Sequence, residues 1–460
     1  MMSLEKQQEL LNELAQIALR RVKDLGAEGF VNAYVSKQYA TRFSNSEILQ
    51  NYVDFQRQLE LTVIYNDKQK SSSLTNDLTE RSVLNLADYV TKVAKLVPPD
   101  PMYPGMLTEE QQFPKLKLND PNAKNIQPVD IVDKIEGAII AGEAIDQKVE
   151  GVSGNFLMVD GYNLFTSTTG IELDFPDTAI TTTLNTQAIE GSEESRSNSN
   201  FGSRDFKKLD METESKEVAE RAVNGLGAIS IEPGDYEVIL DHQAASTIAF
   251  MTGMATSSMQ LISRRSFLND RIGQQVFDDD LSLIHEPHNL DLLSARPIDD
   301  EGLATQGFPV VENGVLKNYS FSRLHAARLG ATPKGCGFSF FGRSIGFPFA
   351  MVVQPGGKSR SQLISEVENG LLVTNLHYTN FVNPPIGSIT GMSKDGLFII
   401  KNGEIVGSAK NMRFTDDIPR ILKDIDVGKE QRQPTSMMGI GGMVAPIRTK
   451  HFKFTSKTEH

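Results

Sequence analysis

The chain has 460 residues, of which 39 % are hydrophobic and 23 % charged, and its formal net charge is −13. This composition is typical of a globular protein long enough for roughly three domains. The acidic balance repels phosphate backbones, and no stripe of lysine and arginine offsets it, so direct nucleic-acid binding is disfavoured. The single cysteine, Cys336, excludes an internal disulfide and favours a reducing compartment such as the cytoplasm.

The first residues predict an amphipathic helix over 3–25. Leucines recur at helical spacing together with Ile17, and Gly26 follows as a helix stop. Residues 1–13 are polar and carry acids, so we expect no signal peptide. No apolar run approaches the ~18 residues that a membrane-spanning helix needs. The sequence therefore indicates a soluble, cytoplasmic protein.

A β-hairpin and a second helix are expected next. A short strand is predicted at 30–35, and residues 56–65 alternate between two faces, as in a half-buried strand. Asn66-Asp67 supplies a turn, and 70–74 return as the partner strand. Asp77 and Glu80 have the spacing of a capping box, which opens a helix that ends before Pro98.

The middle of the chain predicts helices around a set of strands. Residues 104–127 have the composition of a polar linker. Asp160-Gly161 and Thr169-Gly170 are expected to be turns, and the polar residues 190–200 a mobile loop. Helices are expected at 129–149 and 211–226, and strands at 156–159, 163–167 and 178–186.

From residue 234 the chain becomes rich in strand patterns. Asn313-Gly314 and Asn402-Gly403 are the strongest hairpin signals, because both central residues of such turns need positive φ. The last eight residues are polar and predicted to fray. Strands are expected at 236–240, 281–284, 295–297, 308–312, 315–321, 350–354, 371–376, 397–401 and 404–410, and helices at 244–259, 322–329, 359–367 and 418–425.

Together these elements predict an α+β fold without a βαβ repeat. We expect an N-terminal β-hairpin and helix domain at 1–104 and a middle α+β domain at 105–230. A large strand-rich C-terminal domain follows at 231–452, with a tail at 453–460.

Histidine is scarce, and two of the seven lie close together, His285 and His288. They could form a metal pair, but Pro287 argues against a helix, and a spacing of three puts strand side chains on opposite faces. A turn after the 281–284 strand is therefore favoured. His242 follows Asp241, a natural helix N-cap, and a capping or surface role is favoured for it.

Other chemically active residue types also have a structural interpretation. Cys336 would need a base to form a thiolate, and the nearest histidine in the sequence is His325, so a buried thiol is favoured. The glycines at 335, 337, 342 and 439–442 lack the strand and helix context of a nucleotide fingerprint. The acids Asp299, Asp300 and Glu301 suit a hard cation, and we interpret them as structural or as lining a substrate path.

Several segments, taken in order, resemble the TldD/PmbA family, whose members are also named as modulators of DNA gyrase. They are Ser266-Phe267-Leu268, then Asp299-Asp300-Glu301-Gly302, and then residues 313–319, 326–330 and 396–406. The strand at 55–65 and the closing Pro98-Pro99-Asp100-Pro101 resemble the family's N-terminal domain. The resemblance covers about residues 30–450 and implies a zinc metalloprotease system.

In that family the proteolytic subunit carries His-Glu-x-x-x-His on the helix after the first C-terminal strand, together with a distant cysteine. Counted from residues 238–240, the corresponding window runs from Phe250 to Ala255 and contains no ligand. The C-terminal region offers Met437 and Met438 but no cysteine. Zinc catalysis needs converging ligands, a general base and an open position, so we expect no catalytic, cofactor-binding or metal-binding residue in this chain.

The resemblance then implies a PmbA/TldE-like subunit without the zinc motif. It would pair with a motif-bearing TldD-like subunit that holds the zinc, or form a homodimer, and act on unfolded peptide. One alternative is a peptidase or other hydrolase with an unrecognised site, such as His285 and His288 with Asp300 or Glu301. Another is a non-enzymatic, self-associating regulatory protein. Neither nucleic acid nor a membrane is an expected partner.

Overall fold

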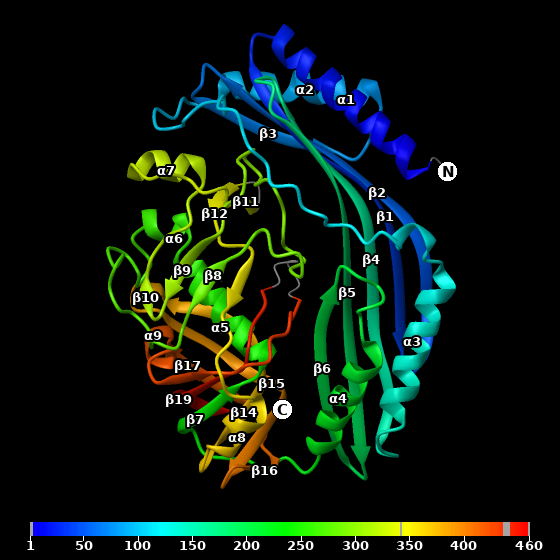
Figure 1. The fold of residues 1–460 in the computed structure, drawn as a ribbon, viewed down its shortest axis with the longest axis vertical. Helices are drawn as coiled ribbons and strands as arrows, with labels where there is room; N and C mark the ends of the chain where they lie inside the picture. The colour runs from blue at the N-terminus through cyan, green and yellow to red at the C-terminus, as the bar shows by residue number, and fades with distance from the viewer. Residues whose placement is uncertain (1–2, 341–342, 436–441, 459–460) are drawn as a thin grey trace.

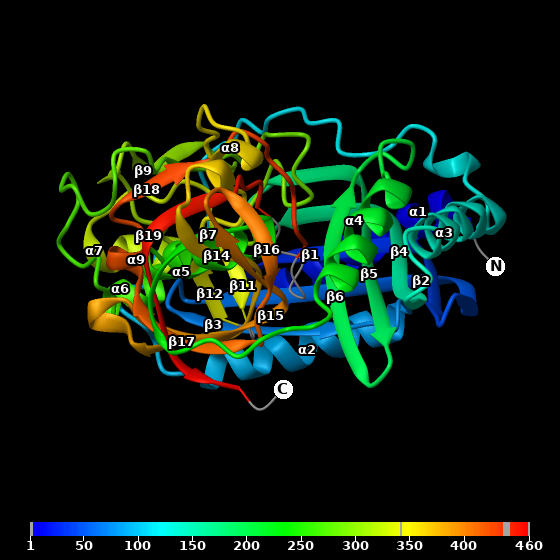
Figure 2. The same cartoon turned by 90° about the horizontal axis from the view of Figure 1, so that it is seen from below.

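The computed structural model describes residues 3–340, 343–435 and 442–458. Figure 1 shows a long, curved N-terminal sheet with its helices, beside a more compact C-terminal half. The two halves remain adjacent when viewed from below (Figure 2). No helix of the described residues combines the length and the apolar character that crossing a bilayer requires.

The N-terminal half is built on one antiparallel sheet with the strand order β3-β2-β1-β4-β5-β6. β1 pairs with β2 on one side and with β4 on the other, so strands from both sides of residue 104 share one sheet. The predicted division at 104 stays a prediction. The elements are α1 (Leu4–Asp24), β1 (Glu28–Ser44), β2 (Glu47–Tyr65), β3 (Gln69–Thr75), α2 (Glu80–Leu96), η1 (Ala123–Asn125), α3 (Pro128–Glu143), β4 (Val149–Ser167), β5 (Glu172–Glu190), β6 (Glu193–Ser203) and α4 (Met211–Asn224).

Side chains alternate between the two faces of the sheet along each strand, and helices cover one of these faces. On β1, Val31 and Val35 lie in the core beneath α1 and α2, and Tyr39 lies in the core beneath α3. Phe30 points to the other face, where it packs in a cluster with Ile298 of the C-terminal half. The sheet therefore lies between its own helices and the C-terminal half.

The C-terminal half contains a larger sheet with the order β14-β7-β19-β17-β15-β16, in which β14 also pairs with β15. That extra pairing closes five strands into a ring. The elements are β7 (Gly234–Leu240), α5 (His242–Ala255), α6 (Ser258–Ile262), β8 (Leu283–His285), β9 (Phe308–Glu312), β10 (Val315–Leu316), α7 (Arg323–Leu329), β11 (Gly337–Phe340), β12 (Arg343–Gly346), β13 (Met351–Val353), α8 (Arg360–Ser365), β14 (Asn369–Asn383), η2 (Pro384–Ile386), β15 (Ser388–Lys401), β16 (Glu404–Ser408), β17 (Met412–Asp417), α9 (Ile418–Ile421), β18 (Ile425–Val427) and β19 (Ile447–Lys457).

Arg204, directly after β6, joins the two halves. Its guanidinium is buried and pairs with Asp177 of β5. It also donates to the carbonyl oxygens of Leu118 and Thr178 in the N-terminal half, at 3.0 and 3.2 Å. On the other side it donates to three carbonyl oxygens of the C-terminal half, those of Leu292, Leu293 and Ala295. One side chain thus holds the linker, β5 and the 292–295 loop together.

The structure confirms the predicted α+β fold and many of its local elements. α1, α2, α4, β3 and β7 lie where the residue patterns predict them. Asn66 and Asp67 turn at φ 48° and 58° between β2 and β3. The predicted hairpins at Asn313-Gly314 and Asn402-Gly403 join β9 to β10 and β15 to β16, with positive φ at all four residues.

Two predictions in the middle of the chain were wrong. No turn interrupts β4 at Asp160-Gly161, because both residues pair with β1 and β5. Most of 190–200 is strand β6 rather than a loop. Its serines are stabilised by α4: Ser199 donates to Glu214 at 2.6 Å, and Arg221 donates to Ser197 at 3.1 Å.

Helix boundaries also differ from the predictions. The N-cap of α2 is Thr79, which accepts from the Ser82 N–H, so Asp77 and Glu80 do not form the predicted capping box. α3 ends at Glu143, because Val149 already belongs to β4. The helix predicted over 244–259 is two helices, α5 and α6.

Strand predictions in the C-terminal half were partly wrong. Residues 295–297 form no strand, since the Ala295 carbonyl bonds to Arg204. The strand that begins at Val315 ends at Leu316. The predicted tail from 453 is ordered up to Lys457, because β19 pairs there with β17 and buries Phe454.

Candidate functional site

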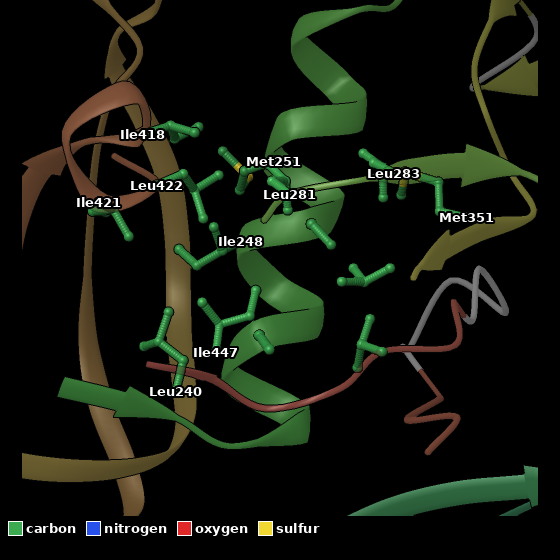
Figure 3. Packing of buried hydrophobic residues seen from close by; sticks show 14 of the residues in the cluster. Leu240, Ile248, Met251, Leu281, Leu283, Met351, Ile418, Ile421, Leu422 and Ile447 are labelled. Atoms are coloured by element: carbon green, nitrogen blue, oxygen red, sulfur yellow. The ribbon is translucent and has the colours of Figure 1, made fainter. Parts of the chain in front are cut away.

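The window that corresponds to the zinc motif lies in the second half of α5. Asp241 begins this helix, since its side chain accepts from the His242 N–H, which confirms the predicted N-cap. Figure 3 shows Ile248 and Met251 projecting from α5 among apolar side chains that include Leu281 and Leu422. The helix is held by the largest apolar core cluster of the C-terminal half.

The three motif positions of this window carry apolar side chains. Phe250 packs on Phe347 with ring centroids 5.6 Å apart, and Met251 and Ala255 are 5 % and 1 % exposed. A Cβ at Gly253 would lie 2.5 Å from the sulfur of Met351. The only side-chain oxygen of the window, Thr252 Oγ1, donates to the Ile248 carbonyl oxygen at 2.8 Å, so these residues do not fit a zinc ion.

His285 and His288 do not form a metal pair. His285 is fully buried, lies 4.8 and 5.0 Å from the rings of Phe349 and Phe308, and accepts from the Ala350 N–H at 3.3 Å. Burial, with the nearby charge of Arg296, lowers its pKa to about 3. His288 instead bonds through Nε2 to both oxygens of Thr305, at 3.0 Å. Each imidazole thus has a hydrogen-bond partner within the fold, and the hydrolase alternative built on this pair stays a prediction.

His242 is buried, so the predicted surface role was wrong. Its Nδ1 lies 2.9 Å from Asp241 Oδ1 and its Nε2 lies 2.9 Å from the carbonyl oxygen of Glu430. Both partners are oxygen acceptors. Arg360 donates twice to Asp241 Oδ2, at 2.8 and 3.1 Å. Although burial opposes ionisation, Arg360 and His242 hold the pKa of Asp241 well below its usual range.

This charged cluster borders a polar cavity of about 380 Å³ between α4, β6 and the C-terminal half. Arg432 spans the cavity wall by pairing with Glu217 of α4 at 2.6 Å. The Arg360–Asp241 pair lies within the C-terminal half, and the Arg432–Glu217 pair fastens α4 to that half.

The acids Asp299, Asp300 and Glu301 bind backbone N–H groups. Asp299 accepts from Glu301, Leu303 and Gly337 at 2.8–2.9 Å. Asp300 accepts from Ser339 N and pairs with Arg296, and Glu301 accepts from the first N–H of α7. Burial and the Glu301 carboxylate raise the pKa of Asp299 to about 7. Asp299 and Asp300 also line a second cavity of about 380 Å³, against the N-terminal sheet.

Cys336 is 1 % exposed, and its Sγ lies 3.4 Å from the Phe321 carbonyl oxygen. Burial, with the charge of Asp299, raises the pKa of this thiol to about 12. The thiol is therefore protonated at neutral pH, which agrees with a buried, inert cysteine.

No sequence pattern predicts the contact between Ser258 and His325. Ser258 Oγ lies 2.6 Å from His325 Nδ1, although 67 residues separate them in the chain. In the sequence, His325 is notable only as the histidine nearest to Cys336. Within residues 3–340, 343–435 and 442–458, no three His, Cys, Asp or Glu side chains form a cluster that could hold a metal ion. Met437, Met438 and Gly439–Gly441 lie outside the described residues.

Comparisons with known proteins agree with this fold. Residues 233–455 match the PmbA/TldA metallopeptidase C-terminal domain. A Metalloprotease PmbA homolog of Haemophilus influenzae is 26 % identical over 439 residues, which cover 92 % of each chain. The Metalloprotease PmbA of Escherichia coli O157:H7 is 22 % identical over 96 % of each chain.

A solved structure has the same fold along almost the whole chain. TldE from Thermococcus kodakarensis superposes with a TM-score of 0.86 at 20 % identity, covering 97 % of this chain and all of that one. The C-terminal domain match, the full-length relatives and the shared fold agree with one another. This chain therefore carries a C-terminal domain of the PmbA/TldA metallopeptidase type and is similar to PmbA relatives over nearly its whole length.

Proposed function

We propose that this chain is the metal-free, PmbA/TldE-type subunit of a two-subunit zinc peptidase. In this proposal a motif-bearing TldD-like partner holds the zinc and cuts the peptide. This chain shapes the chamber and helps to hold unfolded peptide, in the cytoplasm. The observation that carries the proposal is the filling of the α5 window by Phe250, Met251 and Ala255.

The physical reason lies in what a zinc peptidase requires. Activation of water needs three protein ligands, one open coordination position and a general base. Apolar side chains at the three motif positions, Phe250, Met251 and Ala255, remove two ligands and the base together. The same side chains contribute to the core through contacts such as Phe250 with Phe347.

The family names support the peptidase context. The relatives are named metalloproteases, and the solved relative is named TldE. Those names belong to the relatives, and the proposal assigns a role in the same kind of peptidase to this chain.

The test measures zinc content and hydrolysis of a permanently unfolded polypeptide. It uses the isolated chain, a motif-bearing relative from the same source, and their mixture. We expect no stoichiometric zinc and no hydrolysis from the isolated chain, and hydrolysis from the mixture. A relative whose motif glutamate is changed to glutamine should abolish activity in the mixture. Stoichiometric zinc in the isolated chain, or hydrolysis without the relative, would contradict the proposal.

A further inference from the structure

A groove of about 670 Å³ lies between β3 and α7. One wall is strand β3, from Lys70 to Leu74. The opposite wall contains Met259 of α6, His325 of α7 and Ile345 of β12. Figure 1 shows β3 beneath α2, above α7 and β12. The volume is in the range of ordinary ligand pockets.

β3 is the outermost strand of its sheet. It pairs with β2 along residues 69–75, and among the described residues no strand pairs with its other edge. Alternate residues of such a strand present unpaired N–H and C=O groups. Ser71, Ser72 and Ser73 have small side chains, which leave this backbone accessible. A free edge that borders a groove is suited to an added strand.

His325 offers a fixed hydrogen-bond donor on the opposite wall. Ser258 Oγ accepts from the Gly346 N–H at 2.7 Å, so its hydroxyl proton is free to donate to His325 Nδ1. That bond leaves the ring proton on Nε2. Burial, with the charge of Arg328, lowers the pKa of His325 and favours the neutral ring. Ser258 is itself fully buried, so it positions the imidazole and is not exposed as a nucleophile.

Among the charged side chains that line the groove, Lys68, Asp100 and Glu301 have hydrogen-bond or ion-pair partners, and the opposite charges of Glu60 and Lys70 offset each other in part. Lys68 donates to the Tyr103 carbonyl oxygen at 2.6 Å, and Glu301 accepts from Arg323 N at 2.6 Å. The remaining lining includes Leu74, which is 51 % exposed, and half-buried Leu324 and Met259. These surroundings suit neutral main chain with small or apolar side chains better than a charged terminus.

We propose that the groove binds a stretch of extended polypeptide, which adds to the free edge of β3 as a further strand and accepts one hydrogen bond from His325 Nε2. The inference rests on the proposed function, because it gives unfolded peptide a place on this subunit. It does not require the partner or its zinc.

The experiment measures binding of a fluorescent, capped, uncharged decapeptide to the isolated chain by anisotropy. His325→Phe keeps the ring and removes the donor, and we expect affinity to fall about tenfold, the value of one good hydrogen bond. His377→Phe, on β14, is the matched control and should leave affinity unchanged. Ser258→Ala should shift the ring ¹⁵N resonances of His325 toward a mixture of tautomers, and Ser258→Thr should restore the Nε2-protonated form.

Proline substitutions test the strand edge. Ser72→Pro and Ser73→Pro remove neighbouring N–H groups, of which one faces β2 and the other faces the groove. We expect one variant to lose thermal stability and the other to keep its Tm and lose peptide binding. Wild-type affinity in the stable proline variant would overturn the inference. It would also be overturned if the chain dimerised through the β3 edge without peptide and either proline variant abolished that dimer. Failure of the isolated chain to bind peptide would refute this groove and leave the zinc assay of the mixture to decide the proposed function.

Discussion

Replacing Arg204 tests how strongly the two halves are fastened. Arg204→Met keeps the length of the side chain and removes its charge and all of its hydrogen bonds. Asp177 would remain beside the vacated position without its partner. The Leu293 and Ala295 carbonyl oxygens accept from no other described residue. By contrast, the Leu118 and Leu292 oxygens each keep a backbone donor.

The expected loss follows from these contacts. Removing one partner of a largely buried ion pair costs about 3–5 kcal/mol. Asp177 is 29 % exposed, but the carbonyl oxygens of Leu293 and Ala295 lose their donor together with it. The unfolding entropy of a cooperative chain of 460 residues is about 1 kcal/mol/K, so Tm should fall by about 4 °C. If the halves unfold separately, the shift in each is about twice as large, and the transition should split.

Differential scanning calorimetry provides the measurement. Arg196→Met is the matched control, because Arg196 lies on β6 and its contact with Glu194 is exposed at 3.7 Å. An exposed pair contributes about 0–1 kcal/mol, so the control should stay within about 1 °C of the wild type. A Tm for Arg204→Met that is indistinguishable from this control would refute the reasoning.

Three further predictions concern buried titratable groups. His285 has a folded pKa of about 3 against 6.5 for the free side chain, so the unfolded chain gains a proton first and stability falls as pH drops from about 6.5 to 3. His285→Phe should flatten that part of the Tm–pH profile, and a profile parallel to the wild type would contradict this. Asp299, with a folded pKa of about 7, destabilises the fold as pH rises from about 4 to 7. Glu301→Gln should weaken that loss, measured by urea unfolding at pH 4.5 and 7.5, and an unchanged difference would count against the coupling. With a pKa of about 12, only about one Cys336 thiol in ten thousand is ionised at pH 8, so a colorimetric thiol reagent should detect it only in denaturant. Rapid reaction in the native chain would contradict its burial.

Local patterns in the sequence predicted local structure. The leucine spacing of α1 and the Asn-Gly pairs of two hairpins act within a few residues, so they could be interpreted without knowing the fold. The same holds for the α5 window, because the absence of ligand side chains at Phe250, Met251 and Ala255 is a property of the sequence itself.

Features that depend on distant partners could not be predicted. β6 is a strand because it pairs with β5 along residues 193–203, and α4 adds hydrogen bonds at Ser197 and Ser199, although the composition of β6 resembles a loop. Gly161 continues β4 because β1 and β5 flank it. The Ser258–His325 contact depends on the packing of α6 against α7. In each case the deciding interaction joins residues that no short motif links.

The position of β1 between β2 and β4 has a consequence for synthesis of the chain. The β1–β2 hairpin is complete at Tyr65, yet β4 begins only at Val149. Ribosomes add about 5–20 residues per second, so the second edge of β1 waits for its partner for several seconds or more. During that interval the nascent chain carries an open strand edge beside the apolar Val31 and Val35. Early docking of α1 and α2 covers that apolar face and leaves the edge of β1 as the segment that most needs a chaperone.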